Sequence, residues 1–359
     1  MDGDREAILA QIRGGQVKVP NMQSYYDRYR HAISPLLKDL TPSVDATLDK
    51  YASNEKDLRR AKASAFDVFV AAQWPDPDLE RLEFCAMFTI WLFFWDDVVD
   101  RIDGSEHPEV ANSLELGNKY REESYEYVKY HLGFQTEGDS EPPYDNPYLE
   151  FFAMAAKILT KTADRDTAAR FLHETNEFIR CCGWEQECQL AGKILPLDDY
   201  VNLRMGGSAV YTYCAFAPWM IGVSLPKEIL DSPQLRAVWI EVNKNISFSN
   251  DILSMKKEIA DGEFLHLVPV LMKQYNVTLE VAVEMAVKEW AACFDRFDKA
   301  EAELRKLASG FSSAIQEDTE KLISCFQAVQ SGCQYWHKNT SRYGVGQAMH
   351  TDGSLLITI

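Results

Sequence analysis

The chain has 359 residues, of which 46% are hydrophobic and 26% are charged. This composition argues against general disorder, and the length is sufficient for one large domain with a full hydrophobic core. With 37 Lys and Arg against 55 Asp and Glu, the net charge is −18, so the average field of the protein repels polyanions. The charge therefore argues against nucleic acid and anionic membrane surfaces as partners, and an anionic substrate would need local cations.

The N-terminal sequence MDGDREAILAQIRGG contains acidic residues and no apolar run, so we expect no signal peptide. Residues 1–30 are expected to form a partly mobile N-terminal segment. The eight cysteines form no CxxC pair, which argues against a disulfide scaffold and against a zinc finger. We therefore expect a reduced, cytoplasmic protein without stable membrane insertion.

The pattern of apolar residues predicts an all-α protein. Apolar side chains recur every three or four positions, as they do in residues 230–242, and alternating β-branched runs are scarce. Segments of similar helical character lie on both sides of every loop, so no linker divides the chain. We expect one helical domain over residues 31–343, followed by a C-terminal tail over residues 344–359.

The longest apolar run, FCAMFTIWLFFW at residues 84–95, is too short to span a membrane and predicts a buried core helix. Three aspartates follow it directly, in the sequence Asp96-Asp97-Val98-Val99-Asp100. Asp96 and Asp100 share a helix face, about 6 Å apart along the axis, at the negative end of the helix dipole. Without a cation this arrangement is unfavourable. A solvated helix end is the alternative, but the aromatic run favours a metal site at the mouth of an apolar cavity.

A second cluster of oxygen donors occurs in NDILSMKKE at residues 250–258. Asn250, Ser254 and Glu258 are spaced by four residues and form one stripe of a helix. Their amide, hydroxyl and carboxylate oxygens are hard donors, which suit Mg²⁺ or Mn²⁺ and do not suit zinc. Because the stripe has only one formal charge, a bound cation would retain valence for another anion, most naturally a phosphate. An ordinary polar helix face is the alternative.

Together, DDVVD and NDILSMKKE resemble the two metal-binding motifs of class I terpene synthases, in residue types, order and separation. The resemblance is to the short fungal and bacterial sesquiterpene synthases. It implies an α-helical bundle with the active site in its core, three Mg²⁺ ions and an isoprenyl diphosphate substrate, with farnesyl diphosphate preferred. In that family pattern Asp96 binds two of the ions and Asn250, Ser254 and Glu258 bind the third. Asp100 binds metal through water or not at all.

The same resemblance implies roles for the segment around Arg204. Arg204 precedes Asn250 by 46 positions, where the family has its diphosphate-sensing arginine. Gly206 and Gly207 follow it and would permit a break in the helix. By resemblance, Gly207 is the linker residue and Ser208 the effector residue that helps to ionise the substrate.

The resemblance also implies roles for further cationic residues and for residues of the substrate pocket. Arg342 and Tyr343 match the family's Arg-Tyr pair, and Lys257 is a further diphosphate donor. Asp97 is expected to pair with Arg342 when the site closes. The residues implied to line the substrate pocket are Phe66, Leu92, Phe93, Ser208, Tyr213 and Trp336.

Several alternatives stay open at this stage. Geranyl or geranylgeranyl diphosphate as substrate would make the protein a monoterpene or diterpene synthase. A prenyl diphosphate synthase would need a second aspartate-rich motif, and the one candidate, at residues 197–202, is better explained by Asp198 as a helix cap. A non-catalytic helical interaction protein would have acidic helix ends that are merely solvated. A homodimer is compatible with the family.

Overall fold

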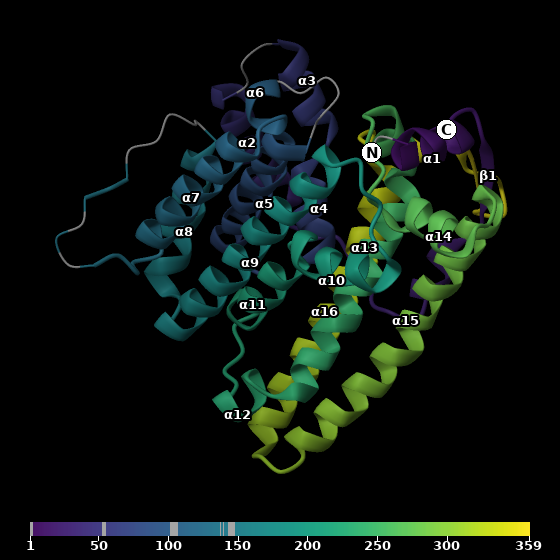
Figure 1. Cartoon of the computed structure of the whole chain (residues 1–359). Helices are drawn as coiled ribbons and strands as arrows, with labels where there is room; N and C mark the ends of the chain where they lie inside the picture. Colours follow the sequence, from purple (N-terminus) through teal and green to yellow (C-terminus); the bar gives the residue numbers. More distant parts are fainter. Residues whose placement is uncertain (1–2, 52–54, 101–106, 137, 139, 143–147) are drawn as a thin grey trace.

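The computed structural model describes residues 3–51, 55–100, 107–136, 138, 140–142 and 148–359, and in these residues the all-α prediction is confirmed (Figure 1). Its α-helices are α1 (Gly3–Ile12), α2 (Leu37–Tyr51), α3 (Glu55–Ala63), α4 (Phe66–Gln73), α5 (Leu79–Asp100), α6 (Pro108–Ala111), α7 (Leu114–His131), α8 (Leu149–Thr162), α9 (Arg165–Leu190), α10 (Leu197–Gly207), α11 (Val210–Met220), α12 (Lys227–Leu230), α13 (Pro233–Ala260), α14 (Leu267–Tyr275), α15 (Leu279–Ala308) and α16 (Ser313–Asn339). The short elements are the 3₁₀ helices η1 (Met22–Tyr26) and η2 (Val345–Ala348) and the strands β1 (Gln16–Val19) and β2 (Leu355–Thr358).

Helix α5 crosses the interior of the bundle. Nearly all side chains of its apolar run, residues 84–95, are buried or half-buried, and the helix packs against α2, α4, α8 and α9. A helix that is apolar on most of its circumference must be covered by neighbours. The run therefore holds Asp96 and Asp97, which follow it directly and are half-buried, at the end of an interior helix.

Helix α13 provides the second long wall. It begins with Pro233 in its first turn and with Ser232 as N-cap, whose hydroxyl accepts a hydrogen bond from Leu235 N at 3.1 Å. The helix packs against α11, α15 and α16 along its length. This contact positions residues 250–258 in the last turns of α13.

The chain breaks between α10 and α11, next to the predicted sensor segment. The residue with left-handed backbone at the break is Ala209, with φ 57°, whereas both glycines remain inside α10. Gly206 instead permits close helix packing, because a Cβ there would lie 2.2 Å from Cys181 Sγ on α9. The expectation that Asp198 caps α10 is wrong. Pro196 occupies the N-cap position, and Asp198 lies in the first turn, where a negative charge is favourable to the helix dipole.

The two ends of the chain meet in a two-stranded antiparallel sheet. Val17 pairs with Ile357, and Figure 1 places both termini close to α1. From α1, Arg5 Nη2 donates a hydrogen bond to the carbonyl of Gly262 at 3.0 Å. The N-terminal segment therefore contacts the turn that follows α13.

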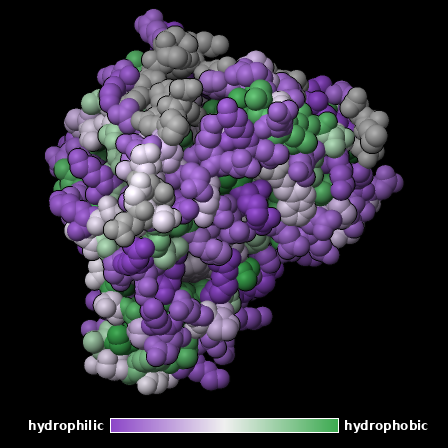
Figure 2. Space-filling view, turned by 60° about the vertical axis from the view of Figure 1, so that its left-hand side comes forward, coloured by the Kyte–Doolittle hydropathy of each residue, from purple (hydrophilic) through white to green (hydrophobic). Residues whose placement is uncertain are grey.

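The outer surface is mainly hydrophilic on the face shown in Figure 2, with hydrophobic atoms in scattered patches. Within the described part of the chain, no helix combines the length and apolarity needed to cross a bilayer. All eight cysteines are buried, and they form no disulfide among the described residues.

The terminal sheet generates a stability prediction. Ile357 is 1% exposed and Leu356, beside it on the same strand, is 36% exposed. Truncation of a buried isoleucine leaves a cavity, so Ile357→Ala should lower the free energy of unfolding by about 2–3 kcal/mol in urea titrations. The control Leu356→Ala should change it by less than about 1 kcal/mol. Equal losses in the two variants would contradict the alternating burial of β2.

Candidate active site

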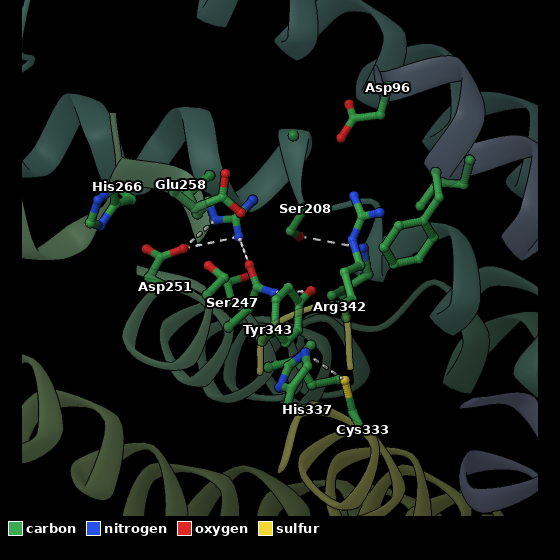
Figure 3. A pocket seen from close by; sticks show the side chains of 18 of the residues that line it. Asp96, Ser208, Ser247, Asp251, Glu258, His266, Cys333, His337, Arg342 and Tyr343 are labelled. Atoms are coloured by element: carbon green, nitrogen blue, oxygen red, sulfur yellow. Dashed lines mark hydrogen bonds and ion pairs between the residues drawn. The ribbon is translucent and has the colours of Figure 1, made fainter. Parts of the chain in front are cut away.

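A cavity opens between α4, α5, α9, α10, α13 and α16, with an empty volume of about 1260 Å³ including its mouth. Asp96 and Asp97 line it from the end of α5. From α13, Asn250, Ser254 and Glu258 line it as the predicted stripe. Figure 3 shows Asp96 across the cavity from Glu258. The structure therefore brings the two oxygen-rich segments to opposite sides of one cavity, whereas the side chain of Asp100 lies outside the described residues.

Asp251, the second residue of the α13 motif, joins three elements. Its carboxylate accepts hydrogen bonds from the Tyr200 hydroxyl, from Arg204 Nε at 3.1 Å and from Leu267 N at 3.0 Å. Asp251 is 1% exposed, and a carboxylate at such depth is stable only when it is paired and hydrogen-bonded. These bonds hold α10 and the start of α14 against α13, and they place Arg204 in the cavity.

Asn250 connects the sensor-like arginine with the Arg-Tyr pair. Its Oδ1 accepts a hydrogen bond from Arg204 Nη2 at 2.7 Å, and its Nδ2 donates to the Tyr343 hydroxyl at 2.9 Å. Both bonds orient the amide, and the carbonyl oxygen has a second lone pair for a further partner. Ser254 is buried and lines the same cavity one turn further along α13.

Arg342 and Lys257 both pair with carboxylates at the cavity. Arg342 Nη2 lies 3.3 Å from Asp97 Oδ1, and its guanidinium stands over the Phe93 ring at 5.0 Å. Lys257 Nζ lies 3.1 Å from Glu258 Oε2 and 3.2 Å from Asp261 Oδ2. The Asp97–Arg342 pair, expected for a closed site, is present in this structure.

Ser208 closes the break between α10 and α11. Its hydroxyl donates to Asn243 Oδ1 at 2.9 Å, and Asn243 Nδ2 donates to the carbonyl of Met205 at 2.8 Å. Asn243 thus ties the break to α13. Gly207 lines the cavity beside it, and a Cβ at Gly207 would lie 3.5 Å from Glu185 Oε2.

Carboxyl groups outnumber cations among the described side chains that line the cavity. Six carboxyl groups face three cationic groups. The carboxyl groups belong to Asp96, Asp97, Glu185, Asp251, Glu258 and Glu263, and the cationic groups belong to Arg204, Lys257 and Arg342. The cavity is therefore acidic and has an electrostatic preference for additional positive charge.

The pKa of Glu185 shows the effect of this excess of negative charge. Burial, together with the carboxylates of Asp96, Asp251 and Glu258, raises its pKa to about 8, although Arg204 opposes the shift. Burial and the neighbouring Glu258 likewise hold the pKa of Glu263 well above its usual value.

The charged partners of the site keep their ionised forms. Burial raises the pKa of Glu258, but Lys257, a hydrogen bond with Glu263 and the charge of Arg342 together keep this pKa below its usual value. Burial lowers the pKa of Arg204, but Asp251 and the neighbouring acidic groups together keep this pKa above its usual value. The site therefore combines ionised pairs with Glu185, which is protonated at neutral pH, and with Glu263, whose pKa is raised.

Aromatic side chains form the other walls. Leu92, Phe93, Tyr213 and Trp336 line the cavity as expected from the sequence, but Phe66 is not among the lining residues. It packs beside Phe93 at 5.3 Å between ring centroids and supports the wall.

Several lining residues were missed by sequence reasoning. They belong to no motif and come from α4, α9, α16 and the segment after α13: Gln73, Glu185, Glu263, His266, Cys333 and His337. Asp251 also lines the cavity and was not predicted to do so, although its position inside NDILSMKKE was a signal in the sequence. Burial lowers the pKa of His337 to about 3, so its imidazole is neutral.

The metal-binding domain of the terpene synthases matches the chain. The model of terpene synthase family 2, C-terminal metal binding, matches residues 87–296, which include both oxygen-rich segments. This match covers more than half of the chain, so the chain belongs to the terpene synthase family.

Named relatives are sesquiterpene-forming enzymes. The sesquiterpene cyclase hepA of Aspergillus oryzae is 28% identical over 365 residues, covering 99% of this chain and 96% of that protein. The (+)-eremophilene synthase of Sorangium cellulosum is 26% identical over 290 residues, covering 80% of this chain and 82% of that protein. Because the chain belongs to the terpene synthase family and matches these cyclising enzymes over most of its length, it is a terpene cyclase.

Solved structures agree in fold. An α-eudesmol synthase superposes with a TM-score of 0.75 at 16% identity, over 86% of this chain and 97% of that one. A germacradien-4-ol synthase from Streptomyces citricolor gives a TM-score of 0.71 at 16% identity, over 87% of this chain and 97% of that one. The prediction of the class I terpene synthase fold is confirmed.

The raised pKa of Glu185 predicts a pH dependence of stability in the metal-free protein. Between pH 4.5 and about 8 the folded state holds a proton on Glu185 that the unfolded chain has lost, so stability falls as the pH rises. Glu185→Gln removes this loss. In urea titrations with a chelator, the free energy of unfolding of the variant should increase relative to that of the wild type as the pH rises from 4.5 to 8.

The control for this measurement is Glu187→Gln, because Glu187 is exposed on the same helix. The free energy of unfolding of this control should change with pH as that of the wild type does, across the whole pH range. A constant difference between Glu185→Gln and the wild type from pH 4.5 to 8 would contradict the assignment.

Proposed function

We propose that this terpene cyclase is a Mg²⁺-dependent sesquiterpene synthase that ionises farnesyl diphosphate, cyclises the carbocation and releases diphosphate. The observation that carries the proposal is the meeting of hard oxygen donors from α5 and α13 across one cavity with aromatic walls. We assign the catalytic domain to residues 31–343. We also propose a cytoplasmic location, because eight buried cysteines that form no disulfide among the described residues suit a reducing compartment.

The donor set fits divalent magnesium. Asn250, Ser254 and Glu258 present amide, hydroxyl and carboxylate oxygens on one stripe, and Asp96 presents a carboxylate opposite. The described side chains contain no group of three His, Cys, Asp or Glu that could hold a metal, so amide and hydroxyl oxygens are essential to the set. We assign two of three Mg²⁺ ions to Asp96 and the third to the stripe, with Mn²⁺ as an alternative. When bound, the ions would stabilise the charge that develops on the leaving diphosphate.

The chain supplies three fixed cations for the diphosphate. We assign Arg204, Lys257 and Arg342 to its phosphate oxygens and the Tyr343 hydroxyl to a further hydrogen bond. Each cation rests on a carboxylate or amide of the site in the absence of substrate. A diphosphate in the cavity would offer these donors stronger, charge-assisted bonds, and it would draw Arg204 away from the Asn250 oxygen.

The walls must then exclude bulk water, because an allylic cation in water is captured at once. Trp336 is 1% exposed, and its Nε1 donates to the carbonyl of Ser64 at 2.7 Å, which fixes the indole against the start of α4. Phe69 packs on the same indole at 4.8 Å between ring centroids. These rings define the surface on which the isoprenoid chain would fold, and aromatic faces attract cations by about 0.5–2 kcal/mol each.

Farnesyl diphosphate is favoured because named relatives across most of the chain are sesquiterpene enzymes. The test is incubation with geranyl, farnesyl and geranylgeranyl diphosphates plus Mg²⁺, followed by gas chromatography with mass spectrometry. We expect cyclic C15 products from farnesyl diphosphate and little turnover of the other two. Preferred turnover of geranyl or geranylgeranyl diphosphate would assign a monoterpene or diterpene synthase, and linear elongated diphosphates would assign a prenyl diphosphate synthase.

Asn250 provides a matched pair of variants. Asn250→Leu removes the amide oxygen and both hydrogen bonds, and should lower kcat by about 100-fold or more, as loss of a preorganised electrostatic contact does. Asn250→Asp keeps an oxygen donor of the same size and should retain much of the activity. Melting curves check that both variants fold. Similar activity in the two variants would rule out a metal-ligand role for Asn250.

A further inference from the structure

The cavity contains a polar side chain that the proposed ionisation does not use. Gln73 is the last residue of α4; it lines the cavity and is 2% exposed. Its Nε2 has no hydrogen-bond partner among the described residues. A buried polar group without a partner costs about 1–3 kcal/mol, so Gln73 has unused hydrogen-bonding capacity inside the cavity.

Gln73 lies at the end of the cavity remote from the metal-binding aspartate. Trp74, the next residue, packs on Phe216 with 5.7 Å between ring centroids, and Phe216 packs on Phe88 at 6.0 Å. Phe88 precedes Asp96 by eight residues of α5, which corresponds to about 12 Å along the axis. A substrate with its diphosphate at Asp96 would therefore extend its hydrocarbon chain toward Gln73.

Other polar groups line the cavity from α11 and α16. The Tyr213 hydroxyl is 2.8 Å from Thr89 Oγ1, and Cys333 Sγ is 3.5 Å from His337 Nε2. Both Tyr213 and Cys333 line the cavity, and Figure 3 shows Cys333 and His337 on the side away from Asp96. A buried water molecule needs two to four polar partners and occupies such a site in preference to a dry apolar one.

We propose that the Gln73 carboxamide holds a water molecule at the floor of the cavity, and that this water captures the final carbocation. The principal product is then a terpene alcohol. This inference rests on the proposed function and decides between its hydrocarbon and alcohol outcomes.

The geometry of an amide suits this role. Its N–H donates to one lone pair of the water oxygen, and its carbonyl accepts a water hydrogen. The second lone pair forms the C–O bond to the cationic carbon, and the resulting oxonium ion loses one proton, which in the overall balance protonates the diphosphate once both leave the cavity. Isoprenyl diphosphate and water thus give a cyclic alcohol and protonated diphosphate. Because the water is held at the far end, it does not meet the allylic cation formed beside Asp96.

The experiment is a reaction of wild-type protein, Mg²⁺ and farnesyl diphosphate in H₂¹⁸O, analysed by gas chromatography with mass spectrometry. We expect the main product to be an alcohol that contains one ¹⁸O atom. In Gln73→Met, which keeps the volume but not the amide, the ratio of alcohol to hydrocarbon should fall roughly tenfold, as loss of one hydrogen bond permits.

The matched control is Gln330→Met. Gln330 is 1% exposed, donates from Nε2 to the carbonyl of Phe326 at 3.1 Å and is not among the cavity-lining residues. This variant should lose stability but keep the wild-type product ratio. If Gln73→Met does not fold, Gln73→Asn, which withdraws the amide by one methylene, is measured instead with the same expected fall.

The outcomes separate the two proposals. If the wild type consumes no diphosphate of any chain length, the proposed function fails. If it forms cyclic products without ¹⁸O, or if folded Gln73 variants keep the wild-type ratio, the water site is overturned and the cyclase proposal stands.

Discussion

The interaction on which the site depends is the buried carboxylate of Asp251. It accepts hydrogen bonds from Tyr200 and Arg204 on α10 and from the backbone N–H of Leu267 at the start of α14. Burial of this charge without partners would cost several kcal/mol, so the carboxylate requires the three elements to converge. That convergence places Arg204 beside Asn250, so that a cation from α10 joins Lys257 of α13 at the second motif.

The overall charge of −18 and an anionic substrate are compatible because charge is arranged locally. At the cavity the three cations are all engaged by acidic or amide groups of the site, and protonation of Glu185 reduces the excess of negative charge, which also raises the pKa of Glu263. A cavity in this state is poised to exchange protons for metal ions. The ions would supply the positive charge that the chain lacks, and the fixed cations would orient the phosphate oxygens through hydrogen bonds.

Sequence reasoning found the parts of the site that follow from local periodicity. The four-residue spacing alone put Asn250, Ser254 and Glu258 on one face, and the apolar run alone put Asp96 at its end. It missed Glu185, Glu263 and Gln73, because single polar residues inside ordinary helices or turns become neighbours only through tertiary packing. It also missed the pairing of β1 with β2, since each strand has four residues and the two lie at opposite ends of the chain. Phe66 shows the same limit, because an inward-facing aromatic residue can support a wall without reaching the cavity.

The aromatic wall connects recognition of the leaving group with the shape of the pocket. Phe93 is covered on one face by the Arg342 guanidinium and contacts Phe66, Phe69 and Trp336 through its remaining surface. That covered face is already occupied by a cation and is not available to a carbocation. In the proposed function, Phe93 would therefore act on the substrate by its shape as long as Arg342 covers this face. Any movement of Arg342 toward a diphosphate would release this face, so the event that binds the leaving group also alters the wall beside the newly formed cation.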